Sequence, residues 1–368
     1  MVEWKKLGEV ANLVRGKVIS KDFIRDNAGI YPVYSSQTAN DGVLGYIDSY
    51  MFDGDFLTWT TDGAYAGTIF RRKGRFNITN VCGLIDIKDQ RLLQDYLYYW
   101  LSLIAKSYVQ EGMGNPKLMS NVASTILIPI PSLSEQQRIV SILDTFTSSI
   151  SNLKQQIEER RKQYEYERYL LLDLEGKEGV EMKKLGEVAN FVKDRIEASF
   201  LNSQNYVSVE NLLKDKAGRI DSENVPFKGN WSCYKHGDVL IGNIRPYLRK
   251  IWLADRKGGT NGDVLIIRPN EFILPQFLYC VLASEKFFEY YNQTAKGGKM
   301  PRGEKSRALS YIIPLPPLST QSRIVSILDT FEQSISNLEE QLAMREKQYE
   351  YYRNQLLTFE GEEERGKT

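Results

Sequence analysis

Apolar side chains recur every three or four residues through two long stretches of the chain, residues 138–172 and 323–357. This spacing is typical of a helix with one continuous apolar seam, and neither stretch contains Gly or Pro. At 1.5 Å per residue each helix would span roughly 50–60 Å. The matching seams predict that the two helices pack against each other. The predicted seam residues are Ile139, Leu143, Phe146, Ile150, Leu153 and Ile157 in the first stretch, and Ile324, Leu328, Phe331, Ile335, Leu338 and Leu342 in the second.

The second half of each stretch interrupts this seam. Arg160 and Arg345 occupy apolar positions of the register, and Tyr164 and Tyr349 follow them. Two interpretations remain open. The arginine stems could cover the edge of the seam while their charged ends reach solvent, or this half of each helix could contact another protein.

The two helical stretches are copies of each other, and the repeat extends over the whole chain. They are identical at 24 of 35 positions with a constant offset of 185 residues, and KKLGEVAN occurs both at residues 5–12 and at residues 183–190. Each half therefore consists of a start motif, a globular region and a long helix. The join between the halves, residues 175–182, is polar and contains glycine, as expected of a linker.

The globular regions contain short β-branched and aromatic runs separated by Gly, Asp and Asn, which predict strands and turns. One longer apolar stretch in each region, residues 92–108 and 275–291, predicts a helix. The fold class is therefore α+β: two β-rich domains and two long helices in an internal repeat. We expect a first domain at residues 1–131, a helix at 132–174, a linker at 175–182, a second domain at 183–316, a helix at 317–358 and an acidic tail at 359–368.

The distribution of charge distinguishes the globular regions from the helices. Residues 183–316 carry 21 basic against 14 acidic side chains, whereas residues 132–182 and 317–368 are both acidic overall. A polyanion would therefore bind the globular regions, and the acidic helices are suited to protein contacts or to solvent.

Composition argues against several classes of protein. Three scattered cysteines and one histidine, His236, argue against a disulfide framework and against zinc sites built from cysteine or histidine. Residues 1–12 lack the apolar core of a secretory signal, and no apolar run of about eighteen residues is present to span a membrane. We expect a cytoplasmic protein that holds no metal.

Motifs of catalysis are also missing. The chain has no phosphate-binding P-loop, no dinucleotide fingerprint and no nucleophile elbow. Glu181 and Lys183 superficially fit a nuclease motif, but they lie in the polar linker without the preceding Pro-Asp. We expect a non-catalytic protein.

Two stretches of the first globular region are candidates for nucleic-acid contacts. The polar stretch with Thr60, Thr61, Asp62 and Tyr65 is predicted to be an exposed loop, although an Asp-Gly turn is the simpler interpretation. The second candidate, the basic stretch at residues 71–75, is predicted to be a turn that either is exposed to solvent or binds DNA phosphates. The basic candidates are Arg71, Arg72, Lys73 and Arg75, together with Lys117 at the end of the Gly-rich loop 111–117.

The second globular region has two corresponding candidates. Arg and Asn are the side chains that read guanine and adenine edges, so one candidate loop comprises Asn243, Arg245, Tyr247, Arg249 and Lys250. A structural loop with its arginines paired to Asp residues is the alternative. The other candidate is a Gly-interrupted basic loop suited to phosphate contacts, with Lys296, Lys299, Arg302 and Lys305.

The layout resembles the specificity subunit of type I restriction–modification systems. The resemblance is carried by KKLGEVAN, present twice, and by the junctions IPIPSLSEQQRIVSILD at residues 128–144 and IPLPPLSTQSRIVSILD at residues 313–329. The second junction differs slightly, with Thr320 where the first has Glu135. The match covers essentially the full chain.

This resemblance implies two target-recognition domains joined by an antiparallel coiled coil. Each domain would read one half of an asymmetric, bipartite double-stranded DNA site, and the helices would set the spacer. The implied partners are two modification (methyltransferase) subunits and a restriction subunit. S-adenosylmethionine, ATP and magnesium would be cofactors of those partners, and this chain would bind none of them. The whole complex would act in defence against foreign DNA.

Two other classes of function remain as alternatives. An interaction scaffold would use the coiled coil and bind proteins through its globular domains, and it would lack salt-dependent affinity for DNA. A nuclease acting alone would cleave DNA as the purified chain.

Overall fold

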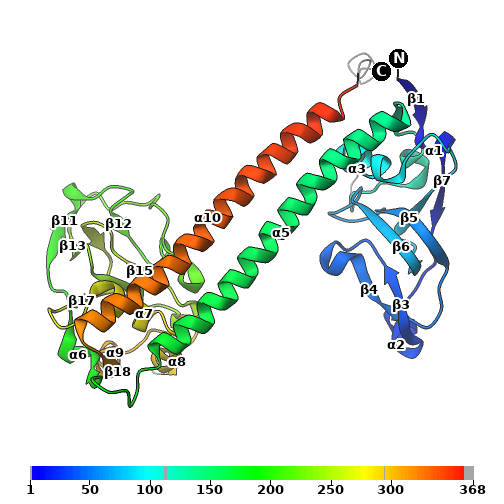
Figure 1. The fold of residues 1–368 in the computed structure, drawn as a ribbon. Helices are drawn as coiled ribbons and strands as arrows, with labels where there is room; N and C mark the ends of the chain where they lie inside the picture. The colour runs from blue at the N-terminus through cyan, green and yellow to red at the C-terminus, as the bar shows by residue number, and fades with distance from the viewer. Residues whose placement is uncertain (1, 112–113, 294, 360–368) are drawn as a thin grey trace. The chain divides into compact units, whose positions relative to one another are not determined.

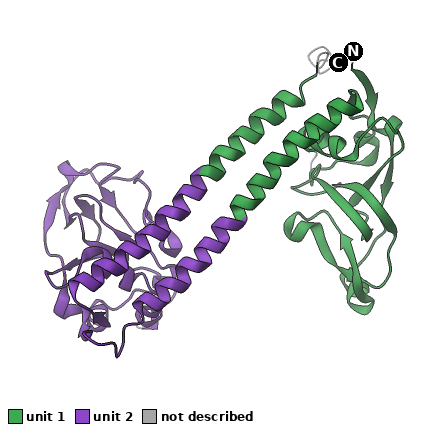
Figure 2. Ribbon diagram, in the orientation of Figure 1, with its two compact units in different colours: residues 1–154, 341–368 green, residues 155–340 purple. Residues whose placement is uncertain are grey.

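The computed structural model describes residues 2–111, 114–293 and 295–359 and divides the chain into two compact units. Unit 1 comprises residues 1–154 and 341–368, and unit 2 comprises residues 155–340 (Figure 2). Each of the two long helices, α5 (Leu133–Leu172) and α10 (Leu318–Leu356), contributes one half to each unit. Apart from Phe359, the predicted acidic tail lies outside the described residues, as do two residues of the 111–117 loop.

Unit 1 is built on a six-stranded sheet of order β2-β7-β5-β6-β3-β4, with helix α3 packed against β5 and β6 (Figure 1). All neighbouring strands are antiparallel except β3 and β6. A separate two-stranded ribbon, β1 with β8, places the start motif beside the junction that leads into α5. The elements are β1 (Glu3–Lys6), α1 (Leu7–Val10), β2 (Ala11–Arg15), α2 (Lys21–Asp26), β3 (Ala28–Tyr34), η1 (Ala39–Gly42), β4 (Val43–Ile47), β5 (Phe52–Thr60), β6 (Ile69–Ile78), β7 (Cys82–Ile87), α3 (Gln94–Ile104), η2 (Ala105–Tyr108), α4 (Ser120–Ala123) and β8 (Leu127–Ile130).

Unit 2 contains two four-stranded sheets, β10-β17-β14-β15 and β11-β13-β16-β12, and the ribbon β9-β18. The first sheet repeats the order β2-β7-β5-β6 of unit 1, so the internal repeat of the sequence is also a repeat of topology. The elements are β9 (Glu181–Lys184), α6 (Leu185–Val188), β10 (Ala189–Phe191), β11 (Arg195–Glu197), η3 (Ala198–Phe200), β12 (Tyr206–Val207), η4 (Lys214–Lys216), β13 (Asn230–Tyr234), β14 (Val239–Gly242), η5 (Pro246–Leu248), β15 (Ile251–Leu253), β16 (Gly258–Thr260), β17 (Val264–Pro269), α7 (Pro275–Leu282), α8 (Glu285–Gln293), α9 (Lys305–Ser310) and β18 (Ile312–Leu315).

The predicted domain helices are largely present. The stretch 92–108 forms α3 and the 3₁₀ helix η2. The stretch 275–291 is two helices rather than one, because α7 ends before Ala283 and α8 starts at Glu285. The Ser284 hydroxyl accepts a hydrogen bond from Phe287 N–H (3.2 Å), which caps the second helix. Within the described residues, no helix is long and apolar enough to cross a membrane.

The start of each long helix is part of a domain core. Ile139 and Leu143 are fully buried in the unit 1 core with Trp59 and Trp100. Ile324 and Leu328 are buried in the equivalent core of unit 2. The first turns of the seam therefore anchor each helix to its own domain rather than to the other helix.

One buried glutamine fixes each of these junctions. The Gln136 side chain accepts a hydrogen bond from Leu93 N–H (2.8 Å) and donates to the carbonyls of Arg91 (2.7 Å) and Pro131 (2.9 Å). Gln321 makes the equivalent three hydrogen bonds, to Leu274, Phe272 and Pro316 in unit 2. Both glutamines are fully buried. The glutamine of the Leu-Ser-x-Gln pattern is thus explained, because its side chain is the hydrogen-bond partner of one backbone N–H and two backbone carbonyls at each junction.

We expect Gln136→Ala to destabilise the protein strongly. The substitution leaves one N–H and two carbonyls without their partner, in one buried and two partly buried hydrogen bonds, and an orphaned buried group costs about 1–3 kcal/mol. Allowing for relaxation and entering water, the free energy of unfolding should fall by roughly 2–5 kcal/mol. Urea unfolding followed by circular dichroism measures this loss. Gln137→Ala is the matched control, since Gln137 is exposed on the same helix turn; equal effects of the two substitutions would contradict the anchoring role.

Beyond these anchors the two helices pack on each other within each unit. In unit 1 the Phe146 and Tyr352 rings stack (5.3 Å between centroids), and Lys154 pairs with Glu346 (2.9 Å). Residue numbers rise on α5 as they fall on α10, so the helix segments are antiparallel there. In unit 2, Arg161 pairs with Glu339 and Tyr164 donates to Glu332 with the same polarity. Each predicted seam residue is buried or half-buried.

The arginines of the seam cover its aromatic residues. The Arg160 guanidinium lies over the Phe331 ring (5.8 Å) in unit 2, and Arg345 lies over Phe146 (5.6 Å) in unit 1. Cation–π contacts of this kind let a charged head remain at the surface while its stem covers apolar area. These contacts agree with the interpretation that the arginines cover the edge of the seam.

Candidate nucleic-acid interface

In unit 1, two loops lie side by side next to the end of strand β5. The first loop, residues 61–67, follows β5, and the second comprises the described residues of 110–118. Backbone hydrogen bonds join them: Gly63 N–H donates to Pro116 O (3.0 Å), and Leu118 N–H donates to Thr61 O (2.9 Å). An isolated β-bridge also pairs Asp62 with Lys117. We call these loops the unit 1 loop pair.

Unit 2 repeats this arrangement after strand β14. The loop 243–250 is joined to the loop 295–303, since Arg245 N–H donates to Pro301 O (2.7 Å) and Gly303 N–H donates to Asn243 O (3.2 Å). Arg302 forms β-bridges with Ile244 and with Lys296. Lys117 forms the corresponding bridges in unit 1, with Asp62 and Gln110. The unit 2 loop pair is therefore the structural equivalent of the unit 1 loop pair, although their sequences do not match.

Three charged side chains meet in the unit 1 loop pair. Asp62 is within ion-pair distance of Lys117 (3.8 Å) and of Arg15 (3.7 Å), and Tyr65 beside them is 57% exposed. Arg15 lies at the end of strand β2, two residues before Lys17. Sequence reasoning missed it because two basic residues around one glycine are too weak a signal to mark a contact. Its position opposite the 61–67 loop is a consequence of the sheet order.

The predicted exposure of Thr60 and Thr61 is wrong, since both are fully buried. The Thr60 hydroxyl donates to Tyr65 O and accepts from Thr68 N–H (3.0 Å). Arg15 donates to the Thr61 hydroxyl (3.3 Å). These hydroxyls hold the loop in shape from inside, so Asp62 and Tyr65 are the residues of that predicted group at the surface.

The predicted basic turn at residues 71–75 is also wrong, because these residues lie inside strand β6 and pair with β5. The glycine that suggested a turn, Gly74, faces Gly54 on β5, and its positive φ (+79°) is accommodated within the ladder. Strand alternation then leaves Arg71, Lys73 and Arg75 exposed and turns Arg72 inward.

Arg72 is a core residue, with a side chain 1% exposed. It pairs with Asp41 (2.6 Å), donates to the Thr58 hydroxyl (3.1 Å) and lies over the Tyr34 ring (3.6 Å). A buried cation with these partners supports the fold and does not reach DNA. Arg72 is therefore removed from the candidate contacts.

The remaining basic residues of β6 are already engaged. Arg71 pairs with Asp95 (2.8 Å) and with Asp144 of α5 (3.3 Å). Burial alone would lower the pKa of Arg71, but the neighbouring carboxylates outweigh it and raise the pKa. Arg75 pairs with Asp53 (2.8 Å), and this hydrogen bond raises its pKa. Lys73, with a side chain 87% exposed, is the freest of the three, at 3.9 Å from Asp55.

In the unit 2 loop pair, strained backbone presents an aromatic side chain. Arg245 and Arg249 flank the 3₁₀ turn η5 and both adopt left-handed backbone (φ +52° and +49°). Pro246 between them is buried, whereas Tyr247 is 51% exposed. Left-handed non-glycine residues cost about 1–3 kcal/mol each and concentrate at functional sites. This geometry favours a binding role for the turn.

Three of the predicted residues of this loop have structural partners instead. Asn243 is buried and accepts a hydrogen bond from Tyr291. Arg249 pairs with Asp215 (2.5 Å) and Glu285 (2.8 Å), and the hydrogen bonds to these two carboxylates raise its pKa. Lys250 donates to a backbone carbonyl, that of Val209 (2.7 Å), and burial lowers its pKa.

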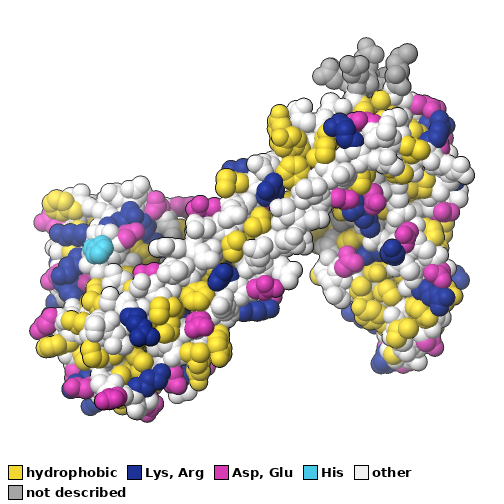
Figure 3. Space-filling model, in the orientation of Figure 1, with side chains coloured by type: hydrophobic (Ala, Val, Ile, Leu, Met, Phe, Trp, Pro, Cys, Tyr) yellow, Lys and Arg dark blue, Asp and Glu magenta, His cyan; other side chains and the backbone are white. Residues whose placement is uncertain are grey.

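The basic residues of the 295–303 loop and its flank are at the surface. Lys296 and Arg302 are exposed and form single ion pairs, with Glu304 (3.4 Å) and Asp263 (3.0 Å). Lys299 and Lys305 are exposed as well. On the face shown in Figure 3, basic and acidic side chains of the described residues are intermixed over both units, so positive charge there is local rather than continuous.

Two β-rich units that present equivalent loop pairs and share two long helices give the chain an internally repeated architecture. Comparison of the chain with known protein families identifies the family to which it belongs. The model for the type I restriction modification DNA specificity domain matches residues 1–160 and again residues 177–344. The chain belongs to the family of type I restriction–modification specificity subunits, the non-catalytic components that recognise the DNA target.

Individual relatives and structures agree with this assignment. A putative type I specificity subunit of Mycoplasma pneumoniae is 28% identical over 361 residues, which are 96% of each chain. The specificity subunit of the type I restriction enzyme MpnII from the same organism is 38% identical over 162 residues, 43% of this chain and 49% of that one. The crystal structure of a type I S subunit from M. genitalium has a TM-score of 0.64 at 16% identity and covers 97% of both chains, which shows a shared fold.

Proposed function

We propose that this chain reads an asymmetric, bipartite DNA site, with one half-site bound by the loop pair of each unit. The proposal rests on one observation: the two loop pairs are held by equivalent backbone bridges but carry different side chains. Equivalent scaffolds with different reading surfaces predict two half-sites of different sequence.

Within this proposal the exposed residues of the loop pairs and the half-buried Asp62 supply the contacts. Tyr65, Asp62 and Lys117 would act for unit 1, and Tyr247, Arg245 and Arg302 for unit 2. Arg and Asp side chains read base edges in the major groove, while lysines fix the register by binding phosphates. The ion pairs that now engage Lys117 and Arg302 would be exchanged for pairs with the DNA.

We further infer that the long helices set the spacer between the half-sites and bind two modification subunits, with a restriction subunit completing the complex. One of the solved structures with a similar fold (TM-score 0.58, 17% identity) comes from work on complex assembly of a type I system. Methyl transfer from S-adenosylmethionine and ATP-driven, magnesium-dependent cleavage would occur in the partners. A cytoplasmic location follows from that role.

We expect Lys299→Ala to weaken DNA binding without altering the sequence preference. Loss of one phosphate contact should reduce the slope of log K against log salt concentration by about 1. Fluorescence anisotropy of a labelled duplex, titrated with the assembled modification complex at several salt concentrations, measures the slope. Lys177→Ala, an exposed lysine in the linker, is the control and should leave the slope unchanged.

Replacement of Tyr247 by Ala tests the reading role of the η5 turn. If the exposed ring contacts bases, affinity for the cognate site should fall by about 1–3 kcal/mol while non-specific binding stays the same, because only the specific term uses this contact. A scaffold without DNA specificity would show neither effect, and its binding would not depend on salt in this way.

A further inference from the structure

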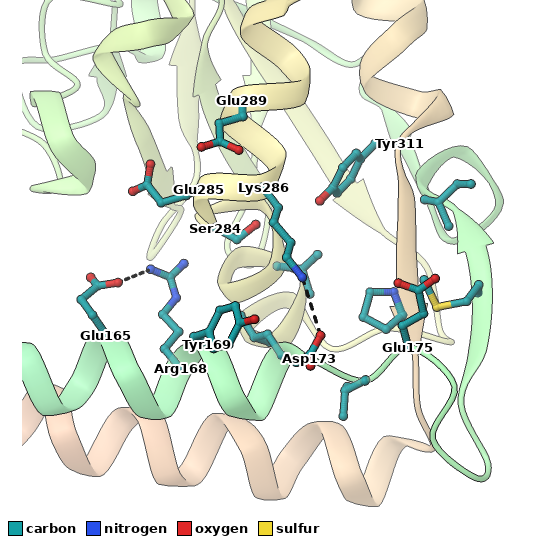
Figure 4. Close-up of a pocket in the computed structure, with 16 residues that line it drawn as sticks. Glu165, Arg168, Tyr169, Asp173, Glu175, Ser284, Glu285, Lys286, Glu289 and Tyr311 are labelled. Carbon is teal, nitrogen blue, oxygen red and sulfur yellow. Dashed lines mark ion pairs between the residues drawn. The ribbon is translucent and has the colours of Figure 1, made fainter.

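A pocket of about 510 Å³ opens in unit 2 between the end of helix α5, helix α8 and the ribbon β9-β18 (Figure 4). Its apolar wall includes Met182, Val281 and Leu174 together with residues of β18. Two of the wall residues are well exposed, Met182 at 42% and Ile312 at 55%. One residue of its rim, Glu285, pairs with Arg249 of the unit 2 loop pair (2.8 Å), but none of the proposed contact residues of that loop pair lines the pocket.

The internal repeat shows what fills the equivalent space in unit 1. Met182 lies opposite Pro314 in its ribbon, and its counterpart Trp4 lies opposite Pro129. Val281 lies seven residues after the leucine bound by the junction glutamine, where unit 1 has Trp100. Leu174 lies two residues beyond the repeated helix, where unit 1 has Phe359.

These three counterparts form an aromatic cluster in unit 1. The Trp4 and Trp100 rings meet edge to face (5.7 Å between centroids), and Phe359 lies 6.4 Å from the first and 5.9 Å from the second. Unit 2 has a thioether and two aliphatic side chains at the same places. Tyr169 and Tyr311 also line the pocket, but at the three places where unit 1 has rings the chain supplies none, so the fold accepts further aromatic rings there.

The rim of the pocket is acidic. Five carboxylates and two cations line it, and three of the carboxylates are already paired: Asp173 with Lys286 (3.6 Å), Glu165 with Arg168 (3.8 Å) and Glu285 with Arg249 (2.8 Å). Glu175 and Glu289 form no ion pair with any described residue. These two carboxylates lie on different elements, one after α5 and one on α8 (Figure 4). An occupant that also carries positive charge would satisfy both.

We propose that this pocket docks an aromatic side chain flanked by basic residues, presented by a partner protein. The ring takes the volume that Trp4, Trp100 and Phe359 occupy in unit 1, and the flanking cations pair with Glu175 and Glu289. Aromatic anchors in a pocket with a polar rim are the usual form of a protein–protein hot spot. The site is independent of DNA recognition, and its failure would leave the proposed function intact.

The methyl group of Met182 provides a direct readout. In the full-length chain labelled with ¹³C at its methionine methyls, of which there are seven, the Met182 signal is assigned by its loss in Met182→Leu. The probe is the peptide acetyl-Lys-Trp-Lys-amide. A ring stacked against this methyl should move its signal upfield in a saturable way, whereas acetyl-Lys-Ala-Lys-amide should leave it in place.

Two substitutions test the two parts of the proposal. Val281→Trp restores the unit 1 residue, fills the pocket and should abolish the shift. Glu289→Gln keeps the shape and should weaken binding of the peptide by up to about fivefold, the range expected for an exposed ion pair. The proposal is overturned if acetyl-Lys-Trp-Lys-amide leaves the Met182 signal unshifted. It is also overturned if acetyl-Glu-Trp-Glu-amide binds with the same affinity, or if the Val281→Trp variant binds acetyl-Lys-Trp-Lys-amide as tightly as the unchanged protein does.

Discussion

Replacing residues 13–127 with the corresponding region of another specificity subunit is expected to change one half of the recognised site completely and to leave the other half as it was. The replaced region contains the whole unit 1 loop pair and the sheet that supports it, whereas the start motif, the β1 strand and most of β8 stay in place. Because each mismatched base pair costs about 1–3 kcal/mol, the original half-site should lose essentially all of its specific affinity.

The exchange keeps the features that attach the domain to the helices. Gln136 remains, and its partners are backbone groups, which any sequence with the same fold can supply. Methylation mapping of the chimera, in the presence of its modification subunit, reads out both half-sites at once. A change in both halves would refute the independence of the two units.

Lengthening both long helices by four residues is expected to lengthen the spacer by one or two base pairs with both half-sites unchanged. Four residues add about 6 Å of rise and turn the helix by 400°, so the seam is displaced by only about 40°. The axis of B-DNA rises by about 3.4 Å per base pair. Duplication of residues 151–154 in α5 and 336–339 in α10 places equivalent insertions in the two copies of the repeat.

Ser148→Gln is the matched control for this experiment. It gives an exposed position of α5 the residue of its counterpart, Gln333, without a change of length, so the spacer should stay the same. The measurement is the distance between the two methylated half-sites in the mapped motif. An altered half-site, or an unaltered spacer in a well-folded variant, would contradict the role of the helices.

The parts of the fold that follow a period could be predicted from the sequence. The spacing of the apolar seam predicted both long helices, because helix formation depends on residues close together in sequence. The repeated motifs predicted the internal duplication. The splitting of 275–291 into α7 and α8 could not be read in the same way, since the break at Ala283 and Ser284 has no Gly or Pro to mark it.

The candidate site was harder to predict because exposure depends on pairing between distant strands. The basic residues 71–75 with their glycine resemble a turn in the sequence. They lie in strand β6 instead, where Gly74 pairs with Gly54 of β5. Because side chains alternate between the two faces of a strand, Arg72 is buried. Arg15 shows the converse case, since only the sheet order brings it to Asp62, which is far away in the sequence. Loops named from composition alone therefore contained both surface contacts and structural supports.

The measurement that tests the central claim most directly is the methylation pattern of cells that express this chain with its modification subunit, obtained by single-molecule sequencing. Two different units that each read DNA predict one asymmetric motif, in which two dissimilar half-sites flank a fixed spacer of unspecified sequence. A methylated motif that is palindromic or continuous would contradict the account, and so would the absence of any methylated motif while a stable complex still forms.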